Sequence, residues 1–151
     1  MHHAPPIHDI TTDTADPPAI IAALPARQAE HAATAAYGGP ATAAQQRAAF
    51  PDIVPVILPL SPAKAFDLAL ATAQSMPRWK ITATDPAAGR IEASEASFWF
   101  GFVDDIVIRV AADGAGSRID VRSLSRQGKG DLGVNAARVR AYIAALRRAA
   151  G

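Results

Sequence analysis

Residues 104–125 read DDIVIRVAADGAGSRIDVRSLS, two alternating segments on either side of a glycine-rich turn. Apolar side chains take every second position: Ile106, Ile108 and Val110, then Ile119 and Val121. A period of two is typical of a half-buried strand, and Asp113-Gly114-Ala115-Gly116 is typical of a hairpin turn. The stretch therefore predicts an antiparallel hairpin with one apolar face.

The same alternation turns charged residues toward the opposite face of the predicted sheet. They are Lys80, Glu92, Asp105, Arg109, Arg118, Asp120 and Arg122. One interpretation is a solvated face on which opposite charges pair across strands, each pair contributing roughly 0.2–1 kcal/mol. The other is a polar groove that holds a ligand or the N-terminal segment of the chain itself.

Further elements extend the hairpin into a domain. Strands are predicted at 53–58, 79–84 and 91–98, and helices at 62–76 and after Asp131. Ser61-Pro62 provides an N-cap followed by proline at the first helical position. Asp131 is the expected N-cap of the closing helix.

The element order is therefore β-α-β-β-β-β-α, which predicts an α+β fold with a five-stranded antiparallel sheet. The first strand is expected at an edge or beside the last strand. Both helices are expected on one face, because the sheet offers a single apolar face. This topology is TATA-binding-protein-like or helix-grip-like, an analogy that carries no function.

The first fifty residues differ in composition from the rest. Of the 39 large apolar residues in the chain, 8 precede Pro51, whereas Ala accounts for 36 of the 151 residues. We therefore predict an extended Ala/Pro-rich N-terminal arm over residues 1–50 and a single domain over 51–151. Short helices are expected within the arm at 27–37 and 42–50, and such helices are marginal alone.

Composition excludes several classes of protein. The chain has no Cys, hence no disulfide framework and no Cys-ligated zinc. Its longest apolar run, 53–60, contains two prolines and falls short of the about twenty residues of a membrane span. We expect a soluble monomer without a signal peptide, cytoplasmic by default, or membrane-associated if the true start lies upstream. A net charge of +1 and few aromatic residues argue against nucleic-acid binding.

The stretch from Arg122 to Asp131 is the strongest candidate binding site. It runs from a strand end through a glycine-rich loop with Lys129 into a helix N-terminus, an arrangement that favours an anion. The alternative is a loop whose glycines only make the turn, with Asp131 as cap. The predicted ligand-binding residues are Arg109, Arg122, Ser123, Ser125, Arg126, Lys129, Asn135 and Arg138.

The stretch 7–13 places His8 beside two carboxylates, Asp9 and Asp13. A metal or acid/base site is one interpretation, but the arm has no core to preorganise these groups. The other interpretation is that Ile7 and Ile10 dock the arm on the domain. We predict no metal site, no cofactor and no catalytic residue. The predicted arm-docking residues are His8, Asp9, Asp13, Asp105 and Asp120.

Several of these segments resemble one known family. The stretch 7–13 resembles its N-terminal signature, 101–105 its central strands, and 120–126 and 130–140 its C-terminal block. The family is the bacterial domain-of-unknown-function family 1499, which has plant and algal relatives. The resemblance covers nearly the whole chain and implies no activity.

The resemblance implies two further expectations. Hydrophobic helices that precede the signature in many relatives imply a soluble domain held near a membrane. The polar signature itself implies that the arm docks on the charged strand face, with Asp9 or Asp13 meeting Arg109, Arg122 or Arg126.

Our leading hypothesis is a non-enzymatic binding module for an anionic small ligand, a lipid headgroup or a membrane-associated partner. One alternative is a hydrolase-like enzyme with a site between the arm carboxylates and the charged strand face, which predicts a deep pocket there. A binding module instead predicts a shallow basic patch. The third alternative is a structural protein-interaction domain.

Overall fold

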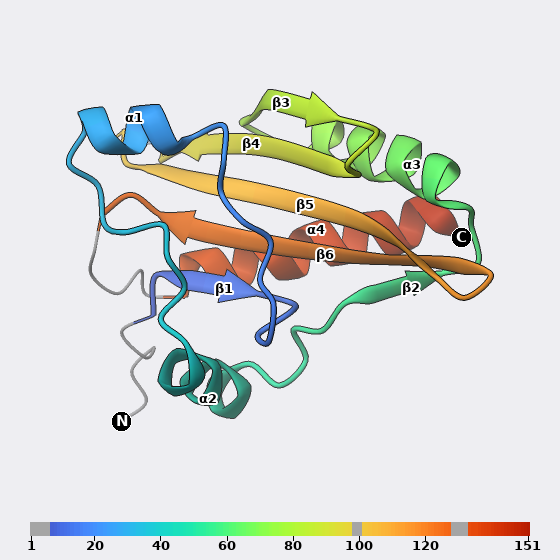
Figure 1. The fold of residues 1–151 in the computed structure, drawn as a ribbon, viewed down its shortest axis with the longest axis horizontal. Helices are drawn as coiled ribbons and strands as arrows, with labels where there is room; N and C mark the ends of the chain where they lie inside the picture. The colour runs from blue at the N-terminus through green and yellow to red at the C-terminus, as the bar shows by residue number, and fades with distance from the viewer. Residues whose placement is uncertain (1–6, 98–100, 128–132) are drawn as a thin grey trace.

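The computed structural model describes residues 7–97, 101–127 and 133–151. It has an α+β fold whose described part contains an antiparallel sheet of six strands and four helices (Figure 1). The strands are β1 (Asp9–Thr11), β2 (Val56–Leu58), β3 (Trp79–Asp85), β4 (Arg90–Ala96), β5 (Val103–Asp113) and β6 (Gly116–Ser125). The helices are α1 (Leu24–Ala29), α2 (Pro40–Ala49), α3 (Pro62–Ser75) and α4 (Val134–Ala150).

The predicted α+β class and antiparallel sheet are confirmed, but the strand count of five was wrong. The order across the sheet is β1-β6-β5-β4-β3, and β2 also pairs with β6. The additional strand, β1, comes from the arm and pairs with residues 122–124. A three-residue strand was overlooked because its sequence signal is short and its partner is distant in the chain.

The apolar core lies between the sheet and the helices α3 and α4, which cover the same face (Figure 1). Tyr142 of α4 is fully buried, stacks on Trp79 with ring centroids 5.3 Å apart, and donates a hydrogen bond to the carbonyl of Ala69 at 2.8 Å. Ile7 and Ile10 of the arm are also buried in this core. The arm therefore adds apolar contacts to the domain although it has no core of its own.

The ends of the helices follow local chemistry. At the start of α3, Ser61 Oγ accepts a hydrogen bond from the N–H of Lys64 at 3.3 Å, which is the expected N-cap. The closing helix begins after Gly133, at φ +84°, and the predicted cap Asp131 lies outside the described residues. In the arm, the helix expected at 27–37 instead spans Leu24–Ala29, because Pro25 favours a helix start.

Two strands share one edge of β6, and Thr12 fills the gap between them. β1 pairs with residues 122–124 and β2 with residues 117–119. Thr12 donates its N–H to the carbonyl of Val121 at 3.0 Å, and its Oγ1 accepts from the N–H of Val121 at 3.0 Å. The same hydroxyl donates to Asp120 at 2.6 Å. The N–H and the hydroxyl of Thr12 thus continue the hydrogen bonding along β6 between the segments that pair with β1 and β2.

The outer edge of β1 is covered by one side chain of α2. Gln46, which is 1% exposed, accepts a hydrogen bond from the N–H of Thr11 at 3.0 Å and donates one to its carbonyl at 2.7 Å. The carboxamide therefore takes the place of a neighbouring strand. An unpaired strand edge is otherwise a template for aggregation.

No helix in the described part of the chain is long and apolar enough to cross a membrane.

Gln46→Leu is expected to destabilise the protein, because it leaves the N–H and the carbonyl of Thr11 buried without partners. The expected loss in the free energy of unfolding is about 1–3 kcal/mol for each group, measured by urea denaturation. Gln45→Leu, at the exposed neighbouring position, is the matched control and is expected to change stability by less than about 0.5 kcal/mol. Equal losses in both variants would contradict the role assigned to Gln46.

Candidate functional site

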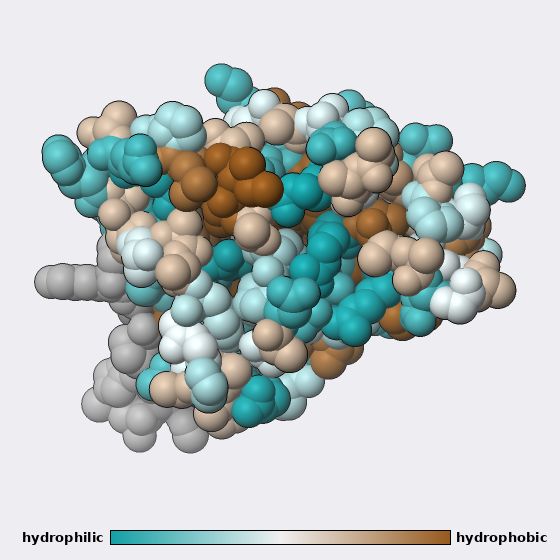
Figure 2. All heavy atoms as spheres, viewed as in Figure 1, coloured by the Kyte–Doolittle hydropathy of each residue, from teal (hydrophilic) through white to brown (hydrophobic). Residues whose placement is uncertain are grey.

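The charged face of the sheet lies beneath the N-terminal arm. The arm crosses in front of β4, β5 and β6, on the side opposite α3 and α4 (Figure 1). Hydrophilic side chains gather in a band across this side of the molecule (Figure 2). A small apolar contact, Ile20 against Val107 and Leu124, lies among the charges. On this face the other contacts between arm and sheet include several buried or half-buried ion pairs.

Arg122 is the most completely buried of the described arginines, at 2% exposure. Its Nε and Nη2 donate to the two carboxylate oxygens of Asp9 at 2.9 and 2.8 Å. Its Nη groups also donate to the carbonyls of Pro18 and Ala35, at 2.9 and 2.8 Å, and its guanidinium lies 5.9 Å from the ring of Tyr37. The arm itself therefore occupies the hydrogen-bonding groups that a ligand would need.

Asp105 is shared by two arginines. Arg126 donates to both of its oxygens, at 2.9 and 2.8 Å, and Arg27 of α1 donates to one of them at 2.8 Å. Arg126 also pairs with Glu30. Arg27 was missed in reasoning from the sequence, although a lone arginine in an alanine-rich segment facing an acidic strand position is a usable signal.

Arg109 and Arg118 hold the turn that follows Thr12. Arg109 lies 3.0 Å from Asp13 and 3.6 Å from Asp120, and Arg118 lies 3.2 Å from Asp13 and 2.8 Å from Asp120. Burial raises the pKa of Asp13. Hydrogen bonds from the N–H groups of Asp16 and Ala15, with the two arginine charges, outweigh burial, so its pKa lies below the ordinary 3.8.

Glu92 takes the place of a missing helix cap. The N-cap residue of α1, Ala23, has no side chain that can accept a hydrogen bond. Instead, the Glu92 carboxylate accepts from the N–H groups of Ile21 and Ala22, at 3.1 and 2.8 Å, and of Ala23 at 3.3 Å. A carboxylate at a helix N-terminus is favoured by the unpaired N–H groups and by the helix dipole. The sheet thereby positions the short helix of the arm.

The structure divides the predicted ligand-binding residues between the two faces of the sheet. Ser123 and Ser125 face α4, where Ser123 Oγ donates to Asn135 at 2.5 Å and Asn135 donates to Ser125 at 2.7 Å. Arg138 is paired with Glu95 and Asp104 there. Arg109, Arg122 and Arg126 lie under the arm, and Lys129 lies outside the described residues. One ligand cannot touch both groups, because the sheet separates them.

The predicted arm-docking residues all lie at the junction between arm and sheet. Asp9, Asp13, Asp105 and Asp120 each pair with arginine. His8 contributes through its main chain: its carbonyl accepts from the N–H of Ser125 at 2.9 Å and from the Asn135 amide at 3.3 Å. Within the described residues, no group of three or more His, Asp or Glu side chains is arranged to hold a metal ion.

A hollow of about 500 Å³ lies on the outer side of the arm, and we call it the α1 hollow. It is lined by Leu24, Arg27, Gln28, His31 and residues 32–36. None of these nine residues carries a carboxylate. The Nε of Arg27 is buried and has no hydrogen-bond partner, whereas both Nη groups are bonded. The described part of the arm thus combines a donor-rich hollow with an unsatisfied guanidinium N–H.

The chain matches one family model and several solved structures, among them two of low sequence identity. The family model described as "Protein of unknown function (DUF1499)" matches residues 9–146. Ara h 8.0201 is 18% identical with a TM-score of 0.45, the match covering 63% of this chain and 90% of that one. TTHA0849 from Thermus thermophilus is 10% identical with a TM-score of 0.30, covering 63% and 84%. Among curated proteins no match was found.

Asp9→Asn is expected to destabilise the protein strongly, because it leaves the buried Arg122 without an opposite charge. The expected loss is about 3–5 kcal/mol in the free energy of unfolding, measured by urea denaturation. Asp16→Asn is the control: its side chain is 90% exposed and lies 3.8 Å from Arg109. A small loss at Asp9, similar to that at Asp16, would show that the pair does not hold the arm.

Asp13→Asn is expected to make the protein less sensitive to acid. The unfolded chain protonates Asp13 at its ordinary pKa, whereas the folded chain does so only at lower pH. Its contribution to stability is therefore complete above about pH 4 and is lost as the pH falls through the folded pKa. Urea unfolding between pH 5 and 3 should show a shallower decline for the variant, and identical declines would contradict the assignment.

Proposed function

The chain belongs to the DUF1499 family, and we propose that it is a non-enzymatic binding module for a small anion. The proposed site is the α1 hollow. The observation that carries the proposal is the composition of its lining, which includes the hydrogen-bond donors Arg27, Gln28 and His31 but no acidic residue. Arg27 is itself paired with Asp105, which does not line the hollow, but its Nε has no acceptor.

The hydrogen-bond donors around the hollow support the same ligand class. The backbone N–H groups of Thr34 and Ala35 donate to no protein acceptor within the described residues. The side chains of Gln28 and His31 are exposed and lie on the same hollow. Acceptor-rich anions such as phosphate or a carboxylate are held in proteins by such combinations of main-chain and side-chain donors.

The orphaned Nε of Arg27 adds a second argument. A buried N–H without an acceptor costs about 1–3 kcal/mol, and more when the group is charged. An acceptor oxygen brought by a bound molecule would remove this cost, and Arg27 is among the residues that line the hollow. The site adjoins Ser125 and Arg126, to which the sequence pattern pointed, but it is built on the arm.

The carboxylates between arm and sheet favour a binding module over the hydrolase-like alternative. General acid–base work needs a group whose pKa lies near the working pH. Asp13 has its pKa lowered below the ordinary value, and Asp9, Asp105 and Asp120 are each paired with arginine. These carboxylates hold the arm in place.

A phosphate titration followed by NMR tests the proposal. Inorganic phosphate is expected to shift the Nε–H signal of Arg27 and the amide signals of residues 31–36. His31→Ala and Gln28→Ala are each expected to weaken phosphate binding about threefold or more, because each removes a donor. Both positions are exposed, so both variants should fold.

Gln45→Ala, an exposed glutamine on α2, is the matched control and should bind phosphate as the wild type does. The proposal fails if phosphate and acetate leave the signals of residues 27–36 unchanged. It also fails if the control loses as much affinity as the two variants in the hollow.

A further inference from the structure

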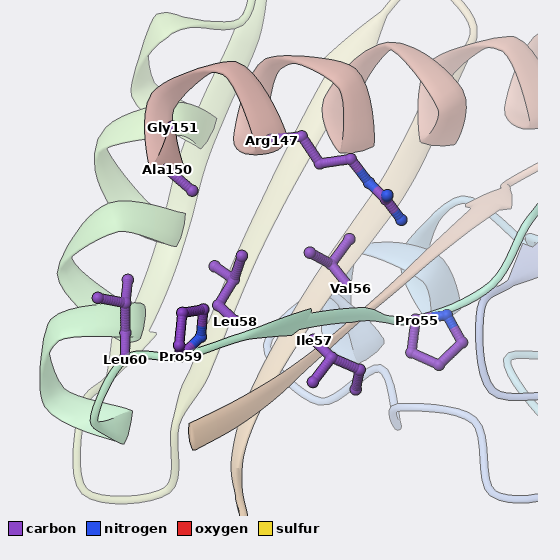
Figure 3. A pocket seen from close by; sticks show the side chains of 9 residues that line it. All are labelled: Pro55, Val56, Ile57, Leu58, Pro59, Leu60, Arg147, Ala150 and Gly151. Atoms are coloured by element: carbon purple, nitrogen blue, oxygen red, sulfur yellow. The ribbon is translucent and has the colours of Figure 1, made fainter. Parts of the chain in front are cut away.

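A second concave surface lies on the far side of the domain from the α1 hollow. This β2–α4 groove, of about 420 Å³, is lined by residues 55–60 and by Arg147, Ala150 and Gly151 at the end of α4 (Figure 3). Its volume falls within the range of small-molecule sites. None of the contacts described above uses it.

The strand side of the groove is apolar and open. Residues 55–60 are all proline, valine, isoleucine or leucine. Val56 and Leu58 point toward α4, whereas Ile57, which is 57% exposed, points away from it (Figure 3). β2 pairs only with β6 among the described strands, so its outer edge is unpaired. This differs from β1, whose edge Gln46 covers. Exposed apolar surface of this kind marks a place where a ligand or partner binds.

Arg147 carries the only charged side chain among the described residues that line the groove. Its side chain is exposed and makes no hydrogen bond or ion pair within the described residues. The side chain of Arg140, two turns earlier, instead donates to both oxygens of Asp52 at 2.7 and 2.6 Å. An unpaired guanidinium beside an apolar floor matches a ligand that carries one negative charge and an apolar chain.

The orientation of Arg147 divides the groove into two ends. Its guanidinium reaches toward Val56 and Pro55, whereas Ala150 lies toward Leu58 and Leu60 (Figure 3). The carbonyl groups at the C-terminus of α4 carry partial negative charge and disfavour an anion at that end. The anionic group is therefore placed at the Pro55 end and the apolar chain along the strand toward Leu60.

We infer that the β2–α4 groove binds a single-chain amphiphilic carboxylate, with Arg147 holding the carboxylate and the β2 side chains contacting the chain. The planar guanidinium fits a carboxylate through two parallel hydrogen bonds. A membrane surface fits less well, because anionic membranes are bound by clusters of about four to eight basic residues. This site is independent of the proposed anion site on the arm.

Titration of the full chain with decanoate, followed by amide NMR and calorimetry, tests the inference. Decanoate is expected to shift the signals of residues 56–60 and 147–151, and decanol to bind at least tenfold more weakly. Arg147→Ala is expected to weaken decanoate binding about tenfold, since a charge-assisted hydrogen bond contributes about 1.5–3 kcal/mol.

Two matched controls separate the groove from general surface effects. Arg148→Ala removes an exposed arginine that does not line the groove, and it should leave decanoate affinity unchanged. Pro59→Ser should weaken binding, whereas Val54→Ser, at an exposed position outside the groove, should not. Each substitution lies at an exposed position, so folding should be retained.

Several outcomes would overturn the inference. They are unchanged signals at residues 56–60, equal affinity for decanol and decanoate, or equal losses for Arg147→Ala and Arg148→Ala. Binding to phosphatidylglycerol vesicles without binding to decanoate would also overturn it, and would assign the surface to a membrane. The phosphate titration reports on residues 27–36, and the decanoate titration reports on residues 56–60 and 147–151. Each proposal can therefore fail without the other.

Discussion

The ion pair between Arg122 and Asp9 is the constraint on which the placement of the arm depends. A guanidinium enclosed to this degree needs an opposite charge and acceptors for its other N–H groups. Asp9 supplies the charge, and the carbonyls of Pro18 and Ala35 supply the acceptors. One side chain of the sheet therefore joins three segments of a chain region with few large apolar residues.

The two faces of the sheet are held by different forces. On the helix side, burial of apolar surface is non-directional, so the position of α3 and α4 follows from shape and area. On the arm side, each buried charge must meet a particular partner, which fixes short segments such as α1 at defined places. The two binding proposals start from groups that these contacts leave unsatisfied. They are the Nε of Arg27, whose Nη groups are bonded to Asp105 and to backbone carbonyls, and the side chain of Arg147 in the β2–α4 groove.

Alternation in β5 and β6 predicted which residues face the helices and which face away, because the pleat sends successive side chains to opposite sides. The same rule, applied to Ser123, would have separated it from Arg122, and grouping the two as one site was an error of sequence reasoning. Gln46 and Glu92 had no such signal. Their partners are backbone groups 35 and about 70 residues away, and any residue type supplies a backbone group.

The sequence by itself determined the class of fold, the apolar face of the sheet and the charged character of the other face, since these depend on periodicity and on local turn and cap chemistry. Tertiary structure decided which charges meet, that Asp9–Thr11 becomes a sixth strand, and where an arginine remains unmatched. Those outcomes depend on how segments distant in the chain are brought together. A charge that is removed from water requires an opposite charge or hydrogen-bond partner. The local sequence around the charged residue does not show where that partner lies.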